Sequence, residues 1–371
     1  MSDATHVKEV LALSLVKNVG PILARQLLAY FKTPSAIFQA TERELMAVPN
    51  IGATVAKSIR ETRALEEAER ELPILEKEGI TPLSFDSPHY PPLLKEIPSA
   101  PLILFYRGRV ETIAHTGKRT LSIVGTRKAT SYGKGFVQNF IAELKDYDPS
   151  ITIVSGLAYG IDAEAHTAAL EQGLPTVGVL GHGFSYLYPP KHHLLAKQML
   201  DNGGLLTEYP YHREPDAPNF LQRNRLIAGL ASATIVVESA AHGGALSTAN
   251  YCLEYKRHLF AVPGYVGKTW SMGCNRLIAQ HKASLIEGVE DLIAALKWEK
   301  RTAAAPSGLF FFPSPEEQQL LDAIGNGEPK SFDEIVQEIN FPINQLQTLL
   351  FDLEMKGQIR QLPGRMYEKT H

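Results

Sequence analysis

The chain has 371 residues and a hydrophobic fraction of 44%, which is ordinary for a globular protein of one to three domains. Its formal net charge is −3, so it lacks the overall basic character that is typical of nucleic-acid-binding proteins. Its two cysteines, Cys252 and Cys274, match no zinc or redox spacing and predict small buried side chains in a reducing compartment. No basic-then-apolar signal opens the chain and no apolar stretch reaches about 18 residues, so we expect a cytoplasmic protein without membrane contact.

Residues 1–60 follow a helical period and contain two similar hairpins. Each places an apolar residue before a turn glycine that opens a helix, at Val19-Gly20 and at Ile51-Gly52. The pattern resembles a helix-hairpin-helix unit, which commonly presents backbone N–H groups to a DNA phosphate. The usual second glycine is missing, since Ile22 and Thr54 stand there. The pattern is compatible with direct DNA contact and with a packing module descended from such a unit.

Residues 61–117 combine a charged helix with a proline-rich connection. The helix is expected from Glu66 to Glu78, and Leu102 to Tyr106 predicts an edge strand that leads into the next domain. Between them, prolines at positions 82, 88, 91, 92, 98 and 101 exclude a continuous helix. We therefore place a helical domain, of helix-hairpin-helix or SAM-like type, at residues 1–80.

The segment from Arg119 to Trp298 repeats a strand and a helix. Strand-like apolar runs occur at 121–125, 151–155, 176–180, 234–238 and 258–262, with helix-length segments between them. Such alternation predicts an α/β fold, in which a parallel sheet is covered by helices on both faces. We expect a Rossmann-like domain at residues 81–298.

The carboxyl-terminal part predicts a linker and a winged helix. Residues 299–315 are rich in alanine and proline and read as a linker. Residues 316–371 predict three helices and a hairpin, and they hold five basic against ten acidic side chains. A winged helix that grips DNA needs a basic recognition helix, whereas Ile343 to Lys356 carries Asp352 and Glu354 against one lysine. The central domain is the better candidate for DNA binding.

Gly125-Thr126-Arg127 closes the first strand of the predicted parallel sheet. The glycine permits a tight turn, the threonine offers a hydroxyl and a backbone donor, and arginine matches phosphate oxygens in pairs. The alternative is a surface arginine paired with a carboxylate. Because ligands bind at the carboxyl edge of such a sheet, the position favours phosphate.

A second glycine-rich turn follows the next strand, with Ser155-Gly156 and Gly160-Ile161-Asp162. Asp162 is expected to cap the following helix, and His166 stands four residues later on the same face. The pair is compatible with catalysis or with a cap beside a hydrogen-bonded histidine. The cap is favoured, because no serine or cysteine nucleophile accompanies the pair.

Three further loops reach the same edge of the sheet. The loop with His182, Lys191, His192 and His193 lacks the usual spacing of metal ligands, so we predict no metal. Arg223-Asn224-Arg225 begins a helix, and its two arginines point to different faces, one toward a ligand and one toward a loop. Glu238 ends a buried strand before Gly243-Gly244, a turn that enters another helix.

The motifs exclude the common nucleotide cofactors. No G-x-G-x-x-G follows the first strand and no acidic residue ends the second, which disfavours nicotinamide and flavin. No Gly-Lys-Ser/Thr follows a strand, so a P-loop is absent as well. We expect no cofactor.

Several motifs in order are similar to the DNA-processing protein A family, also called DprA or Smf. The resemblance covers residues 80–297, and the helical domain and the acidic winged helix agree with the three-part layout of the family. The motifs are Ile123-Val124-Gly125-Thr126-Arg127 with Tyr132-Gly133, Val154 to Asp162 with Ala165-His166, Tyr188-Pro189, Arg223-Asn224-Arg225-Leu226-Ile227, Val262-Pro263-Gly264 and Asn275-Arg276-Leu277-Ile278.

The resemblance implies a non-enzymatic protein that binds single-stranded DNA during natural transformation, protects it and loads the RecA recombinase onto it. It also implies a homodimer. A positive groove with stacking platforms at Tyr188, Phe184 or Phe220 suits a single strand. Carried over by position, with the neighbouring Asp162 and Arg225, the candidate DNA-binding residues are Gly125, Thr126, Arg127, Ser155, Gly156, Gly160, Asp162, Lys191, Arg223, Asn224, Arg225, Gly243 and Gly244.

Two departures from the family pattern stand at these loops. His242 and Ala245 replace hydroxyl residues around Gly243-Gly244, and Lys191 stands where the family has an acidic residue. Two other functions are kept beside the resemblance. One is a nucleoside monophosphate phosphoribohydrolase-like Rossmann enzyme, although the required proline and nearby glutamate are missing. The other is a protein-interaction adaptor that binds no nucleic acid.

Overall fold

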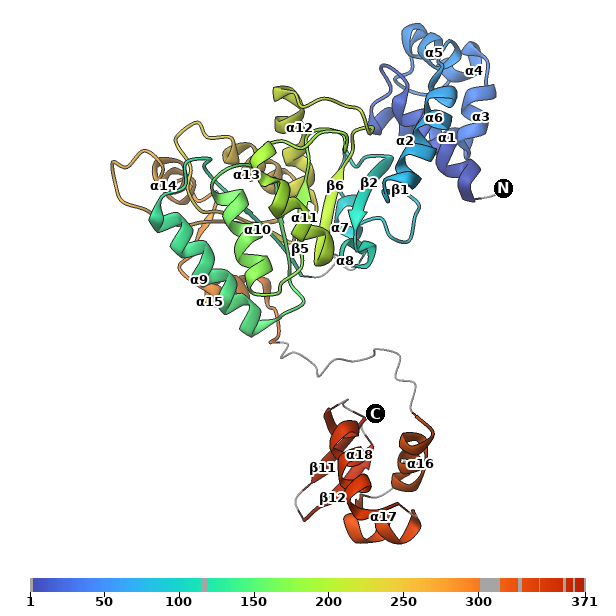
Figure 1. Cartoon of the computed structure of the whole chain (residues 1–371). Helices are drawn as coiled ribbons and strands as arrows, with labels where there is room; N and C mark the ends of the chain where they lie inside the picture. The colour runs from blue at the N-terminus through green and yellow to red at the C-terminus, as the bar shows by residue number, and fades with distance from the viewer. Residues whose placement is uncertain are drawn as a thin grey trace. The chain divides into compact units, whose positions relative to one another are not determined.

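The computed structural model describes residues 3–114, 119–300, 314–325, 329–339, 341–355, 358–362 and 364–369. The chain folds as two compact units, Met1–Lys300 and Arg301–His371 (Figure 1). Of the predicted linker at 299–315, residues 301–313 lie outside the described part of the chain.

The first unit begins with a helical domain. Its helices are α1 (Asp3–Leu15), α2 (Pro21–Phe31), α3 (Pro34–Gln39), α4 (Glu42–Met46), α5 (Ala53–Arg60) and α6 (Ala64–Lys77). Asn18 and Asn50 occupy equivalent turns before the hairpin glycines, each with φ 66°. The two predicted hairpins are therefore built alike. Their apolar core extends to Ile103 and Phe105 of the neighbouring sheet, so the domain packs directly on the central domain.

One nine-stranded sheet organises the rest of the unit. Its order is β1-β2-β6-β5-β4-β3-β7-β8-β9, parallel from β6 to β9, with β1 and β2 antiparallel at one edge. The strands are β1 (Thr81–Ser84), β2 (Ile103–Gly108), β3 (Thr120–Val124), β4 (Thr152–Ser155), β5 (Thr176–Val179), β6 (Gly203–Thr207), β7 (Ala233–Val236), β8 (His258–Ala261) and β9 (Ser284–Leu285). The five predicted parallel strands are confirmed.

The structure corrects two features of the predicted sheet. The strand at 103–108 is not an edge strand, because β1 pairs along its outer side. Strand β6 was not predicted, since its Gly203-Gly204 start has the composition of a loop. The glycine at 203 has φ 140°, and a side chain there would collide with the backbone of Thr176. Close approach of two strands, rather than a turn, requires this glycine.

Helices cover both faces of the sheet (Figure 1). Leu121 and Ile123 of β3 pack against α9, α10 and α15, whereas Val124 faces the core shared with α7, α12, α13 and α14. This alternation is expected of a strand buried on both sides. The helices are α7 (Pro92–Lys95), α8 (Val110–Ala114), α9 (Ser131–Tyr147), α10 (Ile161–Glu171), α11 (His193–Asp201), α12 (Ala217–Gly229), α13 (Ala245–Glu254), α14 (Met272–Ala279) and α15 (Val289–Leu296), with a 3-10 turn η1 (Pro190–His192).

The order of strands creates a switch point beside β3. From β3 the chain proceeds through β4 and β5 to β6 in one direction, then returns to β7 on the other side of β3 and continues to β8. Loops that leave the carboxyl ends of β3 and β7 therefore diverge. Ligands of open α/β sheets bind in the crevice that such divergence leaves.

The second unit is a winged helix. It contains α16 (Pro315–Ile324), β10 (Lys330–Ser331), α17 (Phe332–Glu338), α18 (Ile343–Met355), β11 (Ile359–Leu362) and β12 (Met366–Lys369). The three strands form an antiparallel sheet in the order β10-β12-β11. Ser331 and Glu334 form a capping box at the start of α17. The core contains Leu320, Ile335, Leu346 and Leu353.

Candidate nucleic-acid interface

A chamber of about 380 Å³ lies at the switch point, above the carboxyl ends of β3 and β7. Its walls come from the segments after β3, β4 and β7, from α12 and the start of α13, and from the loop before α14. The lining residues that the sequence predicted are Gly125, Thr126, Arg127, Asp162, Arg223, Asn224, Gly243 and Gly244, joined by Phe220. Lys128, Ala158, Leu221, Ser239, Ala240, Thr248 and Trp270 also line it.

The Gly125-Thr126-Arg127 turn is fixed by backbone hydrogen bonds on both sides. The N–H of Thr126 donates to the carbonyl of Glu238 at 2.7 Å, and its carbonyl accepts from the N–H of Ile161 at 3.2 Å. The sequence therefore fastens the end of β3 to the segments after β7 and β4. Arg127 and Lys128 follow this anchored turn as exposed side chains at the chamber.

Gly160 packs closely against the backbone of the same turn. It has φ 81°, and a side chain there would collide with the carbonyl of Thr126. Only glycine combines this left-handed conformation with such close approach. Gly160 is not a lining residue of the chamber, so its role in the structure is to let two loops touch.

Glu238 is occupied by the start of α9. One carboxylate oxygen accepts from the N–H of Thr130 at 2.9 Å and the other from its hydroxyl at 2.6 Å. The carboxylate also fills the space where Gly133 lacks a side chain. An acidic group beside a helix amino terminus is electrostatically favoured. Glu238 therefore stabilises the start of α9, and both of its carboxylate oxygens already accept hydrogen bonds there.

Arg223 and Asp162 form the charged floor of the chamber. Arg223 is only 4% exposed, and its guanidinium donates to the carbonyls of Gly156, at 2.8 Å, and Val179. Asp162 accepts from the N–H of Gly156 at 3.2 Å. A side chain at position 156 would strike both groups, which explains the glycine.

Burial shifts the pKa values of both Arg223 and Asp162. It lowers the pKa of Arg223 to about 10, although Asp162 opposes the shift, and it raises the pKa of Asp162 against the attraction of Arg223. The arginine stays protonated at neutral pH, and its charge is balanced by the carboxylate. Its Nε–H has no hydrogen-bond partner among the described residues.

The predicted role of Asp162 as a helix cap is wrong. Gly160 occupies the cap position of α10, and Asp162 lies in its first turn, bonded back to Gly156. His166 does not pair with Asp162 but bonds through Nδ1 to the hydroxyl of Thr176 at 2.7 Å. Burial lowers the pKa of His166 to about 3, so it is neutral in the fold. This histidine packs in the interior and does not line the chamber.

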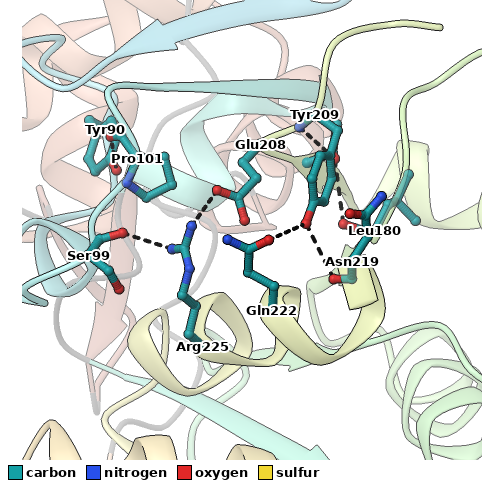
Figure 2. Close-up of polar contacts among 10 residues, drawn as sticks. Tyr90, Ser99, Pro101, Leu180, Glu208, Tyr209, Asn219, Gln222 and Arg225 are labelled. Carbon is teal, nitrogen blue, oxygen red and sulfur yellow. Dashed lines mark hydrogen bonds and ion pairs between the residues drawn. The ribbon is translucent and has the colours of Figure 1, made fainter. Parts of the chain in front are cut away.

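Arg225 lies outside the chamber. Its guanidinium pairs with the carboxylate of Glu208 and donates to the carbonyl of Ser99 at 2.9 Å, as Figure 2 shows. It therefore holds the connection before β2 against α12. Ser155 is also internal, since its hydroxyl donates to the carbonyl of Ile123 at 2.6 Å. Lys191 is exposed on η1 and is not a lining residue of the chamber.

Aromatic rings gather beside the chamber. A small side pocket shares Arg127, Phe220 and Arg223 with it and adds Gly156, Tyr159 and Tyr188. The rings of Tyr188 and Phe220 lie 5.4 Å apart, and both tyrosines are exposed by about two-fifths. Phe184, the third predicted platform, packs instead against the apolar clusters of the interior.

Sequence reasoning did not identify Lys128 and Trp270. Lys128 adjoins Arg127 and could have been found from that adjacency. Trp270 lies 34 residues after β7 ends at Val236, and its carbonyl accepts from the N–H of Ser239 at 2.7 Å. No local sequence pattern predicts the long-range contact between Trp270 and Ser239.

The histidines near this edge bond to protein groups. His182 is buried, and its ring contacts the carbonyl of Gly183 and the N–H of Tyr188, while His192 bonds to the carbonyl of Leu157 at 2.9 Å. Across the described residues, no three His, Cys, Asp or Glu side chains gather into a group that could hold a metal ion. In the same part of the chain, no helix combines the length and apolarity needed to cross a bilayer.

Comparison with protein families gives three matches along the chain. Residues 81–297 match the family of DNA recombination-mediator protein A, residues 299–365 match the DprA winged helix domain, and residues 10–71 match the helix-hairpin-helix motif. Protein Smf of Synechocystis sp. is 32% identical over 399 residues, covering 97% of this chain and 98% of that protein. DNA processing protein DprA of Bacillus subtilis is 37% identical over 227 residues, covering 61% of this chain and 75% of that protein.

Two solved structures share the fold. DNA processing protein A from Streptococcus pneumoniae aligns with a TM-score of 0.64 and 29% identity, covering 77% of this chain and 95% of that one. The protein of the same name from Helicobacter pylori, whose structure concerns its single-stranded DNA binding mode, aligns with a TM-score of 0.52 and 26% identity, covering 59% of this chain and 95% of that one.

Proposed function

Since the chain belongs to the DNA recombination-mediator protein A family, which includes proteins named DprA and Smf, we propose that it binds single-stranded DNA in the chamber beside β3 and β7. The observation that carries the proposal is the anchored turn after β3, which presents Arg127 and Lys128 to the chamber. A fixed turn positions charge for a phosphate at little further cost in conformational entropy.

The residues of the chamber take different parts in this proposal. Arg127 and Lys128 contact a phosphate, and the half-buried Gly243 and the exposed Gly244 let the strand approach α13 closely. Asn224 supplies an amide to sugar or phosphate oxygens. Arg223 contributes less charge, because Asp162 balances it, and two carbonyls already accept hydrogen bonds from its Nη1. The proposal assigns no direct contact with DNA to four of the predicted residues, Ser155, Gly160, Lys191 and Arg225.

Phe220 and Trp270 are apolar rings in the wall of the same chamber. Stacking on aromatic side chains holds bases of any sequence, because every base has a π-face. Binding is therefore expected to depend on phosphates and stacking and not on base identity.

We extend the proposal to the cellular role. The protein protects incoming single strands in the cytoplasm during natural transformation, loads the RecA recombinase onto them and acts as a homodimer without catalysing a reaction. Two names of relatives, DNA processing protein DprA of Bacillus subtilis and of Streptococcus pneumoniae, support the link to DNA processing. Loading is tested by the rate at which RecA assembles on a strand coated with single-strand-binding protein, with and without this protein.

The alternative of a phosphoribohydrolase-like enzyme requires an available carboxylate beside the glycine turn. Glu238, the nearest candidate, has both oxygens bonded to Thr130. Incubation with nucleoside monophosphates followed by chromatography tests this activity directly. Release of free base would overturn the non-enzymatic assignment.

The binding proposal is tested by fluorescence anisotropy with labelled single-stranded and duplex oligonucleotides of the same sequence. Tighter binding of the single strand, lost in Arg127→Ala, supports the chamber as the site. Equal affinity of wild type and variant would place the DNA elsewhere. Absence of binding to either nucleic acid would favour the adaptor function.

A further inference from the structure

The loop between β8 and α14 exposes two apolar side chains at its tip. Tyr265 is 75% exposed and Val266 is 97% exposed, and they are neighbours in the chain. The loop projects from the body near α14 (Figure 1). Exposed apolar surface of this kind is a common feature of sites that bind a partner.

The loop is held in place at its base. The side-chain amide of Asn275 bonds to both the N–H and the carbonyl of Gly264, at 3.0 and 2.8 Å. The hydroxyl of Tyr132, from the first turn of α9, donates to the carbonyl of Pro263 at 2.6 Å. Tyr265 is therefore presented on a fixed platform.

The other end of the loop forms part of the proposed DNA chamber. Trp270 lines the chamber, and its carbonyl accepts a hydrogen bond from the N–H of Ser239, another lining residue. Tyr265 and Trp270 are five positions apart in the chain, a length that spans at most about 18 Å. A strand that fills the chamber needs only a few more nucleotides to reach the tip.

The chemistry of the loop fits a nucleic acid. Residues 263–271 include Lys268, which is exposed, and contain no acidic residue. Two adjacent side chains bury far less than the roughly 1,200 Å² of a stable protein interface. A base, in contrast, stacks on a single exposed aromatic ring while a lysine contacts the neighbouring phosphate.

The geometry points to Tyr265 and Lys268 as a second contact for the single strand, outside the chamber, with a base stacked on Tyr265 and a phosphate beside Lys268. This inference rests on the proposed function and adds a stretch of the DNA path to it. It predicts that short strands bind through the chamber alone, whereas longer strands also use the loop.

The test measures anisotropy of labelled oligothymidines of about 4 and about 20 nucleotides with the full-length protein. Tyr265→Ala is expected to weaken binding of the long strand about fivefold or more and to leave the short strand unchanged. Tyr265→Phe keeps the ring and is expected to bind like wild type. Tyr30→Ala removes a tyrosine that is 55% exposed in the helical domain and serves as the matched control.

Each result separates this inference from its rivals. If Tyr265→Ala binds the long strand as tightly as wild type does, the loop contact is overturned and the proposed function stands. Size-exclusion chromatography with light scattering measures the oligomeric state of the same variant. If the variant no longer forms the dimer, the tip of the loop is a contact between two copies of the chain, and the DNA contact is overturned. If wild type binds neither oligonucleotide, the proposed function and this inference fail together.

Discussion

Arg223 and Arg225 stand two residues apart on α12, yet their side chains serve opposite sides of the helix. Arg223 lies under the chamber with Asp162, whereas Arg225 pairs with Glu208 and holds the carbonyl of Ser99 (Figure 2). Residues two apart on a helix point in different directions, so one short motif supplies the floor of the chamber and also holds the connection that precedes β2.

This division predicts different consequences for two similar substitutions. Arg223→Leu and Arg225→Leu each leave a buried carboxylate without its counter-charge, which destabilises folding by about 3–5 kcal/mol. Only Arg223→Leu is expected to weaken DNA binding by the protein that stays folded. Urea unfolding and anisotropy measure the two effects. Adding Asp162→Asn or Glu208→Gln removes the respective carboxylate charge and should restore part of the stability.

Arg127→Ala is expected to weaken single-strand binding by about 1–3 kcal/mol, the range for a lost charge-assisted hydrogen bond and the group left unpaired. Lys191→Ala should cost less, because Lys191 is not a lining residue of the chamber and a flexible ammonium is screened by solvent. Anisotropy at low salt compares them. If the lysine variant loses more affinity than the arginine variant, the strand follows η1 and not the turn after β3.

Binding should be steeply salt-dependent and insensitive to base sequence. Phosphate contacts release counterions, so the logarithm of affinity falls linearly with that of salt concentration. We expect Lys128→Ala to reduce the slope by a little less than one, since it removes a single cation from the chamber. A flat plot for wild type would assign most of the affinity to base stacking.

The strands that position the site could be predicted, because β3, β4, β5, β7 and β8 are short runs made mainly of apolar residues. The turn at Gly125 could be predicted for the same reason, since it directly follows such a run. What local pattern could not supply is where a buried polar group finds its partner. Arg225 reaches Glu208, and Glu238 reaches Thr130, across large separations in sequence.

Acid should destabilise the fold through its buried histidine. The pKa of His166 is about 3 in the fold, below its ordinary value of 6.5, so the unfolded state binds a proton that the native state does not. The contribution of His166 to the free energy of unfolding is fully present above about pH 6.5. It falls as the pH is lowered toward 3, by up to about 1.4 kcal/mol per pH unit. Burial also lowers the pKa of His182, which acts in the same direction.

The variant His166→Asn keeps an amide near Thr176 without titrating in this range. Its stability, measured by urea unfolding between pH 5 and 6.5, should depend less steeply on pH than that of wild type. The same substitution at the exposed His212 is the control and should leave the slope unchanged. Equal slopes for all three proteins would show that His166 is protonated in the fold.

Removal of the winged helix should leave most of the single-strand affinity. The chamber is lined entirely by residues of the unit that ends at Lys300, and residues 316–371 hold five basic against ten acidic side chains. That balance makes binding of phosphate unfavourable, so we expect the winged helix to serve protein contacts or to modulate DNA binding in the chamber. A truncation at Lys300 is compared with the full chain by anisotropy, with circular dichroism and light scattering to confirm folding and the oligomeric state. A tenfold loss, about 1.4 kcal/mol, in a folded truncation of unchanged oligomeric state would mean that the acidic unit contributes to DNA binding despite its charge.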